Sequence, residues 1–277
     1  MFYGEELNDI HNIQLKILKE VVELCKKYDI KYFAIGGTAL GTIRHRGFIP
    51  WDDDIDIGMT RENYNKFIKI AKTELPNNLF FQHFSTEEDT PFYFTKVRDK
   101  DTEFIEPYCS DLTINHGIFI DIFPYDNIPD NKILRNIHYI KIKFLNNLFI
   151  SKTLVNINSN KNDFVSKFKR NFRKLLNFLL RNVDKNTIFN KLDKEVKRYN
   201  DIETKTVGFI AENEITKKEW INTLENRKFE NIYVFVPRDY HWYLSSLYGD
   251  YMKVPKEENR VNHNPSKVKV NGVEYEY

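Results

Sequence analysis

Hydrophobic residues near the start of the chain recur at spacings of three and four. They begin at Leu7 and end at Tyr28, which predicts an amphipathic helix over residues 5–28 that packs on the core. The apolar run KYFAI then predicts a short strand that leads into Gly36 and Gly37, and TALGTIRH predicts a short helix after them. The sequence therefore opens with a helix, followed by a strand, a tight turn and a second helix.

The next part of the chain alternates between strand-like and helix-like patterns. Apolar positions predict a strand over 55–59, and Thr60 is placed to cap a helix over 61–75 that stops before Pro76. Further strands are predicted at 79–84, 92–98 and 117–123.

The second half begins with a different pattern. Residues 131–200 are helical in pattern, with a loop near 157–163 that contains NSNKND. After them, TVGFIA and IYVFV predict short strands, and Pro237 is predicted to open a helix that ends at Gly249.

These elements predict an α/β (α+β) protein with a mixed sheet flanked by helices. The chain has 277 residues, which is enough to bury a large core, and an aromatic content of 15% argues against disorder. We expect residues 1–130 to form a catalytic core, 131–200 a basic helical insertion, and 201–277 the part that completes the core.

Charge is distributed unevenly along the chain. The net charge is +2, but residues 131–200 contain 17 Lys and Arg against 4 Asp and Glu. This excess favours an anionic partner, either a glycan or the inner face of an anionic membrane, although the Lys-rich outer faces of solvated helices would give the same pattern. No nucleic-acid partner is predicted.

Targeting signals and cysteines narrow the setting. The N-terminus MFYGEELNDI carries acids where a signal peptide is basic, and no apolar run approaches the roughly 20 residues that span a bilayer. Cys25 and Cys109 form neither a disulfide framework nor a CxxC pair, so structural zinc has no support. We therefore expect a cytoplasmic protein, with peripheral contact at the inner membrane as an option for the basic segment.

The stretch WDDDIDIGM is the strongest chemical signal. In an extended chain Asp52, Asp54 and Asp56 share one face at spacings of roughly 6–7 Å. Like charges so placed repel each other, and a hard divalent cation such as Mg²⁺ or Mn²⁺ would reverse that effect. A solvated acidic loop is the simpler alternative, but Trp51 and Ile55 interleave with the acids.

A second acid stands alone inside the apolar run GIFIDIF. An unpaired buried carboxylate is costly, so Asp121 must be protonated, paired or bound to a metal. Two carboxylates from one strand and one from another can hold two metal ions. An EF-hand loop is excluded because its sixth and twelfth positions would be Ile57 and Asn63, whereas a DxD-type glycosyltransferase stays open.

Phosphate binding is predicted from the glycines and nearby basic residues. Gly36, Gly37 and Thr38 can bring backbone N–H groups and a helix N-terminus close to a phosphate. The basic residues predicted to contact a nucleotide are Arg44, His45, Arg46, Lys96 and Arg98.

The string IGGTALGTIRHRGFIPWDDDIDIGMTRENY resembles the LicD family of phosphocholine and related phosphotransferases, relatives of the fukutin proteins. YFTKVRDKDT, HGIFIDIFPYD and YGDYMKVPKEENRVNH are similar to later blocks of that family, so the likeness covers most of the chain outside 131–200. The resemblance implies a nucleotidyltransferase fold whose GG turn falls on Gly36 and Gly37. Its acid pair falls on Asp54 and Asp56, and its later acid on Asp121. The gap between glycines and acids is longer than usual for the fold.

The resemblance also implies a reaction. CDP-choline or another CDP-alcohol would donate its phospho-alcohol group to a hydroxyl of a teichoic acid, lipooligosaccharide or other anionic or lipid-linked glycan, releasing CMP. Asp54, Asp56 and Asp121 would hold Mg²⁺ or Mn²⁺, with Asp52 as a further candidate ligand, and Asp121 or Asp52 would accept the proton of the acceptor.

The C-terminal block supplies candidate donor or acceptor contacts, and the choice of reaction stays open. Tyr248 and Tyr251 could enclose a quaternary ammonium group, although core packing explains tyrosines equally well. Arg260 and His263 lie in the same block. Alternatives are a nucleotidyltransferase that adds a nucleoside monophosphate, a glycosyltransferase, and a binding module without turnover.

Overall fold

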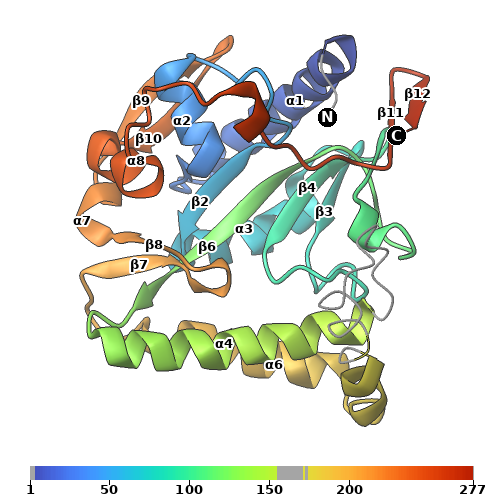
Figure 1. Cartoon of the computed structure of the whole chain (residues 1–277), viewed down its shortest axis with the longest axis vertical. Helices are drawn as coiled ribbons and strands as arrows, with labels where there is room; N and C mark the ends of the chain where they lie inside the picture. The colour runs from blue at the N-terminus through green and yellow to red at the C-terminus, as the bar shows by residue number, and fades with distance from the viewer. Residues whose placement is uncertain (1–3, 155–170, 172–173, 277) are drawn as a thin grey trace.

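A mixed seven-stranded sheet forms the centre of the protein in a computed structural model, which describes residues 4–154, 171 and 174–276 (Figure 1). Five strands run in the order β1-β2-β6-β4-β3, and β7 pairs with the far end of β6 and with β8. The strands are β1 (Phe33–Ala34), β2 (Asp56–Thr60), β3 (Leu79–Gln82), β4 (Thr95–Asp99), β6 (Phe119–Ile128), β7 (Thr206–Phe209) and β8 (Glu214–Lys217). The predicted α+β class is confirmed.

The register of β2 against β6 positions the acids. These two strands are parallel and are the only parallel pair among the described strands, and Asp56 lies directly beside Asp121. Helix α3 (Arg61–Glu74) follows β2 at once and packs against both strands. On its other side β6 pairs antiparallel with β4, which sets Lys96 beside Asp121. One acid of the DDDID run, the lone acid and a lysine therefore meet on adjacent strands.

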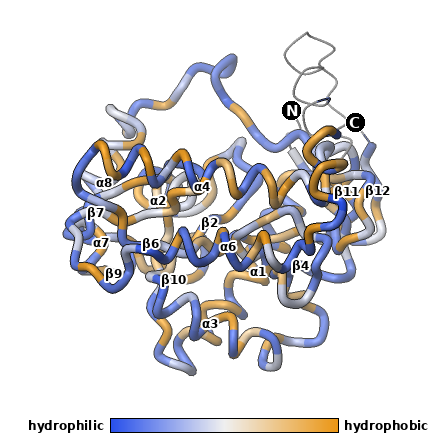
Figure 2. Tube along the Cα trace, turned by 90° about the horizontal axis from the view of Figure 1, so that it is seen from below, coloured by the Kyte–Doolittle hydropathy of each residue, from blue (hydrophilic) through white to orange (hydrophobic). Residues whose placement is uncertain are grey.

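Helices cover the sheet and its edges. Helix α1 (Glu5–Lys27) buries the predicted apolar stripe against β4 and β6, next to α3. Helix α2 (Gly36–Arg44) packs on α8 (Tyr240–Tyr248). Helices α4 (Lys132–Thr153) and α6 (Lys185–Val196) run side by side along the lower edge, and Figure 2 shows both from below. Their inner residues join the same hydrophobic core as the sheet.

Two smaller sheets complete the fold. One is a hairpin of β9 (Leu224–Phe229) and β10 (Ile232–Pro237). The other joins β5 (Glu103–Ile105) to β11 (Lys267–Val270) and β12 (Val273–Glu276) near the C-terminus. The described residues also contain the short helix α7 (Lys218–Ile221) and four short 3₁₀ segments, at Pro107–Cys109, Lys197–Tyr199, Ile210–Glu212 and Glu257–Asn259.

Several predicted boundaries were wrong. Pro237 ends β10 instead of opening a helix, and α8 begins three residues later after Asp239. Strand β4 begins at Thr95, so Phe92 precedes it. Strand β6 continues to Ile128 through Pro124, because Pro124 lies where the pairing of β6 passes from β4 to β7.

Two further points concern the basic segment. The predicted 157–163 loop lies outside the described residues, and the division of the chain at 130 and 200 stays a prediction. No helix among the described residues is long and apolar enough to cross a membrane.

Candidate active site

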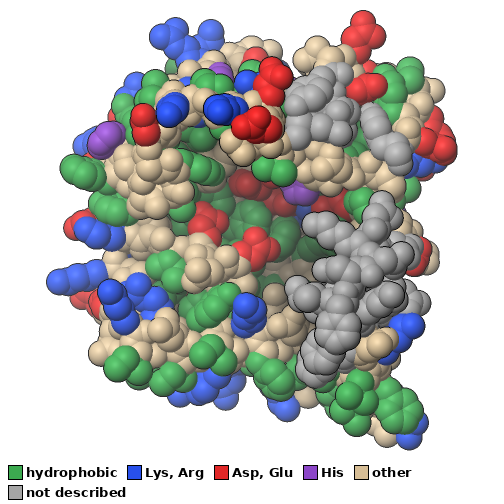
Figure 3. All heavy atoms as spheres, viewed as in Figure 1, with side chains coloured by type: hydrophobic (Ala, Val, Ile, Leu, Met, Phe, Trp, Pro, Cys, Tyr) green, Lys and Arg blue, Asp and Glu red, His purple; other side chains and the backbone are tan. Residues whose placement is uncertain are grey.

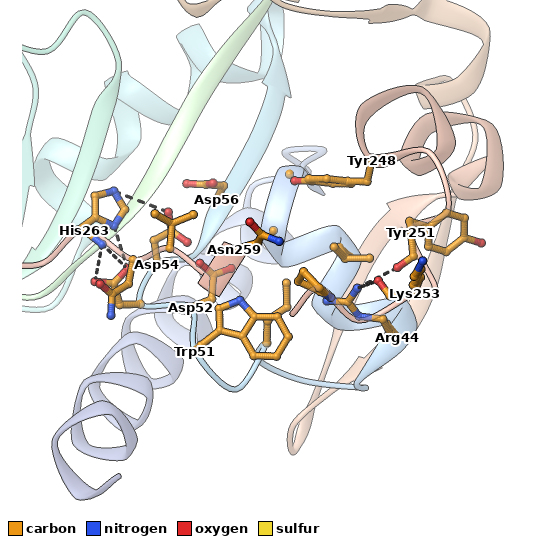
Figure 4. A pocket seen from close by; sticks show the side chains of 18 of the residues that line it. Arg44, Trp51, Asp52, Asp54, Asp56, Tyr248, Tyr251, Lys253, Asn259 and His263 are labelled. Carbon is orange, nitrogen blue, oxygen red and sulfur yellow. Dashed lines mark hydrogen bonds and ion pairs between the residues drawn. The ribbon is translucent and has the colours of Figure 1, made fainter. Parts of the chain in front are cut away.

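A cavity of about 660 Å³ opens beside the acidic loop that precedes β2. Figure 3 shows acidic side chains gathered in a central hollow of the molecule, and Figure 4 shows the cavity from close by. Its walls come from α2, the loop before β2, the end of α8 and the segment that follows α8. The predicted site residues that line it are Gly36, Gly37, Arg44, Asp52, Asp54, Asp56, Tyr248, Tyr251 and His263.

The glycine turn lies against the acids. A Cβ on Gly37 would sit 2.5 Å from Asp52 Oδ2, and one on Gly36 would sit 3.5 Å from Asp56 Oδ2. Gly36 also has a φ of +50°, which disfavours other residues. Thr38 does not line the cavity, but its Oγ1 accepts a hydrogen bond from the backbone N–H of Asp56 at 2.8 Å. The N-terminus of α2 and the acid loop therefore form one unit in which Thr38 has a positioning role.

The buried acids of the loop repel each other when they are ionised. Burial, with the charges of Asp54 and Asp53, raises the pKa of Asp52 to about 9. Burial raises the pKa of Asp54 as well, and burial together with Asp54 and Asp121 raises that of Asp56 well above its usual range. The carboxylates thus oppose each other's ionisation, and a cation among them would relieve the conflict.

Asp121 lies behind this group and is held by Lys96. Lys96 Nζ is 2.9 Å from Oδ1 and 3.0 Å from Oδ2 of Asp121, and it hydrogen-bonds to Oδ2. Burial raises the pKa of Asp121 to about 6 although Lys96 opposes the rise. Oδ1 of Asp121 is buried and accepts no hydrogen bond in the described structure. Lys96 does not line the cavity, so its placement suits it to control the charge of Asp121 more than to bind a phosphate.

Arg98 does not reach the cavity, and its predicted phosphate contact is not supported by its position. Its side chain is fully buried and donates hydrogen bonds to Gln82 Oε1 at 2.6 Å and to the carbonyl of Gly117 at 2.8 Å. The guanidinium also lies 3.5 Å from Glu106 Oε2. These contacts use the guanidinium to join β4 with β3 and the segment before β6.

The segment after α8 brings His263 back to the acids. His263 Nδ1 is 2.9 Å from Asp53 Oδ1, and the backbone N–H of His263 donates to both oxygens of Asp53 at 3.1 Å. His263 Nε2 is 3.9 Å from Asp54 Oδ2. Partial burial opposes the charge on His263, but Asp53 and Asp54 outweigh it and raise its pKa to about 9. A cationic imidazole therefore faces the acid loop from the side opposite Tyr248 (Figure 4).

Trp51 is the centre of a group of aromatic and basic side chains at the mouth of the cavity. The guanidinium of Arg260 lies 4.3 Å from the Trp51 ring centroid, and that of Arg44 lies 5.9 Å away. Arg44 donates to the carbonyl of Tyr251 at 2.9 Å and to His45 Nε2 at 3.0 Å. Partial burial lowers the pKa of His45, and Arg44 lowers it further. Arg44 faces the cavity, whereas His45 and Arg260 do not line it.

The two tyrosines differ in position. Tyr248 extends over the cavity toward Asp56 (Figure 4), and its hydroxyl would be 3.8 Å from a Cβ on Gly36. Tyr251 is buried, and its hydroxyl lies 3.3 Å from His241 Nδ1, away from the acids. The aromatic side chains placed to meet a ligand are therefore Tyr248 and Trp51.

Helix α1 supports the acid loop through contacts that the sequence did not reveal. Gln14 donates to the carbonyl of Asp53 at 2.7 Å and to that of Phe119 at 3.2 Å. His11 Nε2 lies 2.7 Å from the carbonyl of Asp52. The signal was available, because Gln14 is a polar residue beside Ile13 and Ile17 on the apolar side of the helix.

The carboxylates do not form a closed metal cage as they stand. Within the described residues, no three His, Cys, Asp or Glu side chains converge closely enough to hold an ion. The donor chemistry nonetheless suits a hard cation, because Asp52, Asp54, Asp56 and Asp121 offer only carboxylate oxygens.

Comparison with known proteins gives two kinds of match. Residues 29–148 match the sequence model described as LicD/FKTN/FKRP, nucleotidyltransferase domain. The chain is also 30% identical over 259 residues to the lipopolysaccharide cholinephosphotransferase LicD of Haemophilus influenzae, which covers 90% of this chain and 92% of that protein. A shorter match of 55 residues, 46% identical, links it to an uncharacterised protein of Rickettsia typhi; it covers 20% of this chain and 18% of that one.

Proposed function

This chain belongs to the LicD family of phosphotransferases, and from that premise we propose that it transfers phosphocholine, or a similar phospho-alcohol group, to a hydroxyl of a cell-surface glycan. The Haemophilus influenzae relative is named for lipopolysaccharide and for choline phosphate, which supports both the group and a lipid-anchored acceptor. CDP-choline is the proposed donor, and teichoic acid is a second class of acceptor. The observation that carries the proposal is one cavity whose lining includes carboxylates of the acid loop, the N-terminus of α2 and the rings of Trp51 and Tyr248.

The proposed reaction is a displacement at phosphorus. An oxygen of the acceptor hydroxyl forms a bond to the phosphorus that bears choline, and the bond from that phosphorus to the bridging oxygen of the diphosphate breaks. CMP leaves with the bonding electrons, and the hydroxyl proton passes to a base. Such reactions depend mainly on positioning and on charge stabilisation.

The residues divide into a phosphate side and a choline side. Arg44 and the N-terminus of α2 at Gly36 and Gly37 face the cavity and would meet the anionic diphosphate. Tyr248 and Trp51 present aromatic rings to the same space, where a quaternary ammonium group is attracted to their π-faces. This pairing of a cationic wall with aromatic rings is what a zwitterionic phosphocholine group needs.

Mg²⁺ or Mn²⁺ is the proposed cofactor, held by Asp54, Asp56 and Asp121 with Asp52 as a further ligand. The carboxylate oxygens are the right type of ligand for such an ion, but the side chains would have to turn toward it to bind it together. Bound there, the cation would neutralise charge on the diphosphate and on departing CMP. Two ions are expected, because one carboxylate pair and one separate acid can share them.

Asp121 is the preferred proton acceptor. Its pKa of about 6 leaves it ionised at neutral pH, and Lys96 keeps it so. Asp52 is the second candidate, but its pKa of about 9 leaves it protonated at neutral pH until a cation binds nearby.

Mass spectrometry of the products tests the proposal. The protein would be incubated with Mg²⁺, CDP-choline and a panel of CDP-alcohols, sugar nucleotides and lipooligosaccharide or amino-sugar acceptors. CMP release with a phosphocholine mass on the acceptor is expected, and it should disappear with EDTA and in Asp54→Asn/Asp56→Asn. Asp250→Asn is the matched control, since Asp250 lines the cavity outside the acid cluster. Transfer of a nucleoside monophosphate or of a sugar would instead identify a nucleotidyltransferase or a glycosyltransferase.

A further inference from the structure

Helix α4 carries an apolar stripe on the face that points away from the core. Ile133, Ile137, Ile140 and Phe144 are between 47% and 70% exposed. At about 100° per residue these four positions fall within an arc of about 60°. Three of the residues that α4 buries, His138, Ile142 and Phe149, lie on the opposite side of the helix. Core packing therefore explains one face of α4 and leaves the other unexplained.

Helix α6, which packs beside α4, has a polar solvent-facing side and is a useful comparison. It runs beside α4 and buries Ile188, Leu192 and Val196. Its exposed positions are polar, including Asn190 and Lys194. The stripe on α4 is thus a local feature of that helix. A contiguous exposed apolar surface of this kind marks a contact with a partner or with a membrane.

The charge around the stripe points to an anionic partner. Helix α4 contains no Asp or Glu, and Lys132, Lys141 and Lys143 flank the stripe. None of these three lysines forms an ion pair with another described residue. Figure 3 shows the lower edge of the molecule, over α4, as hydrophobic and basic side chains intermixed. An apolar stripe bordered by lysines is the pattern of a helix that lies in the interface of an anionic bilayer.

Exposed apolar residues continue beyond the end of α4. Phe178 and Leu179 are at least 60% exposed. Their segment is fixed to α4 because Asn177 donates to the carbonyl of Ser151 at 2.9 Å and Lys152 to that of Leu180 at 3.0 Å. The surface available to a bilayer is therefore longer than α4 alone.

We propose that the outer face of α4 docks the protein on an anionic lipid bilayer, so that the cavity works next to the membrane that holds its acceptor. The part about the acceptor rests on the proposed function, whereas lipid binding itself does not. In Figure 3 the acidic hollow opens above this edge. A glycan anchored in the bilayer below α4 would then reach the acids without leaving the surface, which raises its effective concentration.

Vesicle co-sedimentation tests the docking. Vesicles of phosphatidylglycerol and phosphatidylethanolamine should bind the wild type, and vesicles of phosphatidylcholine alone should bind it much less. In Ile133→Ser/Ile137→Ser/Ile140→Ser/Phe144→Ser we expect binding to fall roughly 100-fold or more. Lys141→Gln/Lys143→Gln should lose roughly ten- to thirtyfold, and binding should weaken with salt.

The control removes exposed apolar side chains elsewhere. Ile202→Ser/Tyr233→Ser changes two residues that are 54% and 66% exposed and lie outside α4, and it should bind vesicles like the wild type. All the altered side chains are exposed, so thermal melting should be unchanged. The proposal is overturned if the stripe variant binds vesicles as well as the wild type does. It is also overturned if the wild type ignores lipid and the stripe instead mediates dimerisation or glycan binding.

Turnover separates this inference from the proposed function. With a soluble glycan acceptor, the stripe variant should match the wild type. With the same glycan anchored in anionic vesicles, it should be slower by the factor that vesicle binding loses. No turnover by either protein, with vesicle binding intact, would remove the proposed reaction but leave the docking surface in place.

Discussion

Replacing Lys96 by methionine should expose how the buried charges are balanced. Lys96 is 2% exposed, and its Nζ lies 2.9 Å from Asp121 Oδ1 and 3.9 Å from Glu106 Oε1. Methionine retains most of the apolar stem against Phe119 but leaves two buried carboxylates without this cation. Removing one partner of a buried ion pair typically costs about 3–5 kcal/mol, so we expect that loss in the free energy of unfolding at pH 7.5.

The loss should depend on pH through Asp121. Burial raises the pKa of Asp121 to about 6 although Lys96 opposes the rise, so without Lys96 this pKa should be higher still. A carboxyl whose folded pKa is raised lowers the free energy of unfolding as the pH rises above the unfolded pKa, and this loss levels off only above the folded pKa. The loss is therefore larger in Lys96→Met at neutral pH, whereas at lower pH Asp121 is mostly protonated in both proteins. The difference between wild type and Lys96→Met should therefore be largest near pH 7.5 and narrower near pH 5.

Arg98→Met is the matched variant. It removes the other cation from Glu106 but does not touch Asp121. Both variants should lose stability, whereas only Lys96→Met should lower the turnover of the folded protein, by about tenfold or more, through Asp121. Urea unfolding at pH 5 and pH 7.5, with turnover measured at a temperature where both variants are folded, gives the comparison. A stability loss under about 1 kcal/mol, or one equal at both pH values, would refute the reasoning.

Three further outcomes are expected. Gly37→Ala places a Cβ 2.5 Å from Asp52 Oδ2, so turnover should fall by about tenfold or more while the melting temperature changes little; unchanged turnover would show that Asp52 moves freely. Burial lowers the pKa of His83 to about 4, so the unfolded chain binds a proton first as pH falls from about 6.5. This difference in protonation lowers the free energy of unfolding by about 3 kcal/mol by pH 4. In urea unfolding, His83→Asn should lack this part of the decrease in stability with falling pH. Ile142→Ala should destabilise by about 2–4 kcal/mol in the same assay, whereas the exposed Ile140→Ala should cost under about 0.5 kcal/mol; equal costs would contradict the assigned faces of α4.

Local patterns predicted the elements around the site well. The apolar stripe of α1 and the strand after the acids depend on neighbouring residues, so their periodicity is visible in the sequence. The lone acid in GIFIDIF was also informative, because its neighbour in the sheet is an acid of the DDDID run. The strand end predicted at 123 and the helix start predicted at Pro237 were both wrong. The effect of a proline on a strand depends on whether a neighbouring strand needs the N–H that proline lacks, and the sheet determines this.

Contacts between distant residues could not be predicted in this way. Arg98 resembles a phosphate ligand in sequence, and only the packing of β3 and the segment before β6 shows that its donors are already used. Asp53 is indistinguishable from its acidic neighbours until His263 is placed beside it. The exposed face of α4 could not be predicted for a related reason. The helix is apolar on both sides, and composition does not show which side packs against the core.

The hydrogen-bonded pair of Asp53 and His263 also has a consequence for biosynthesis. The two residues are 210 positions apart, so at roughly 5–20 residues per second the ribosome makes the acidic loop about 10–40 s before its histidine. During that interval the nascent chain carries a dense group of acids without their cationic partner. The acid loop can therefore reach its final charge balance only after the C-terminal segment has been made.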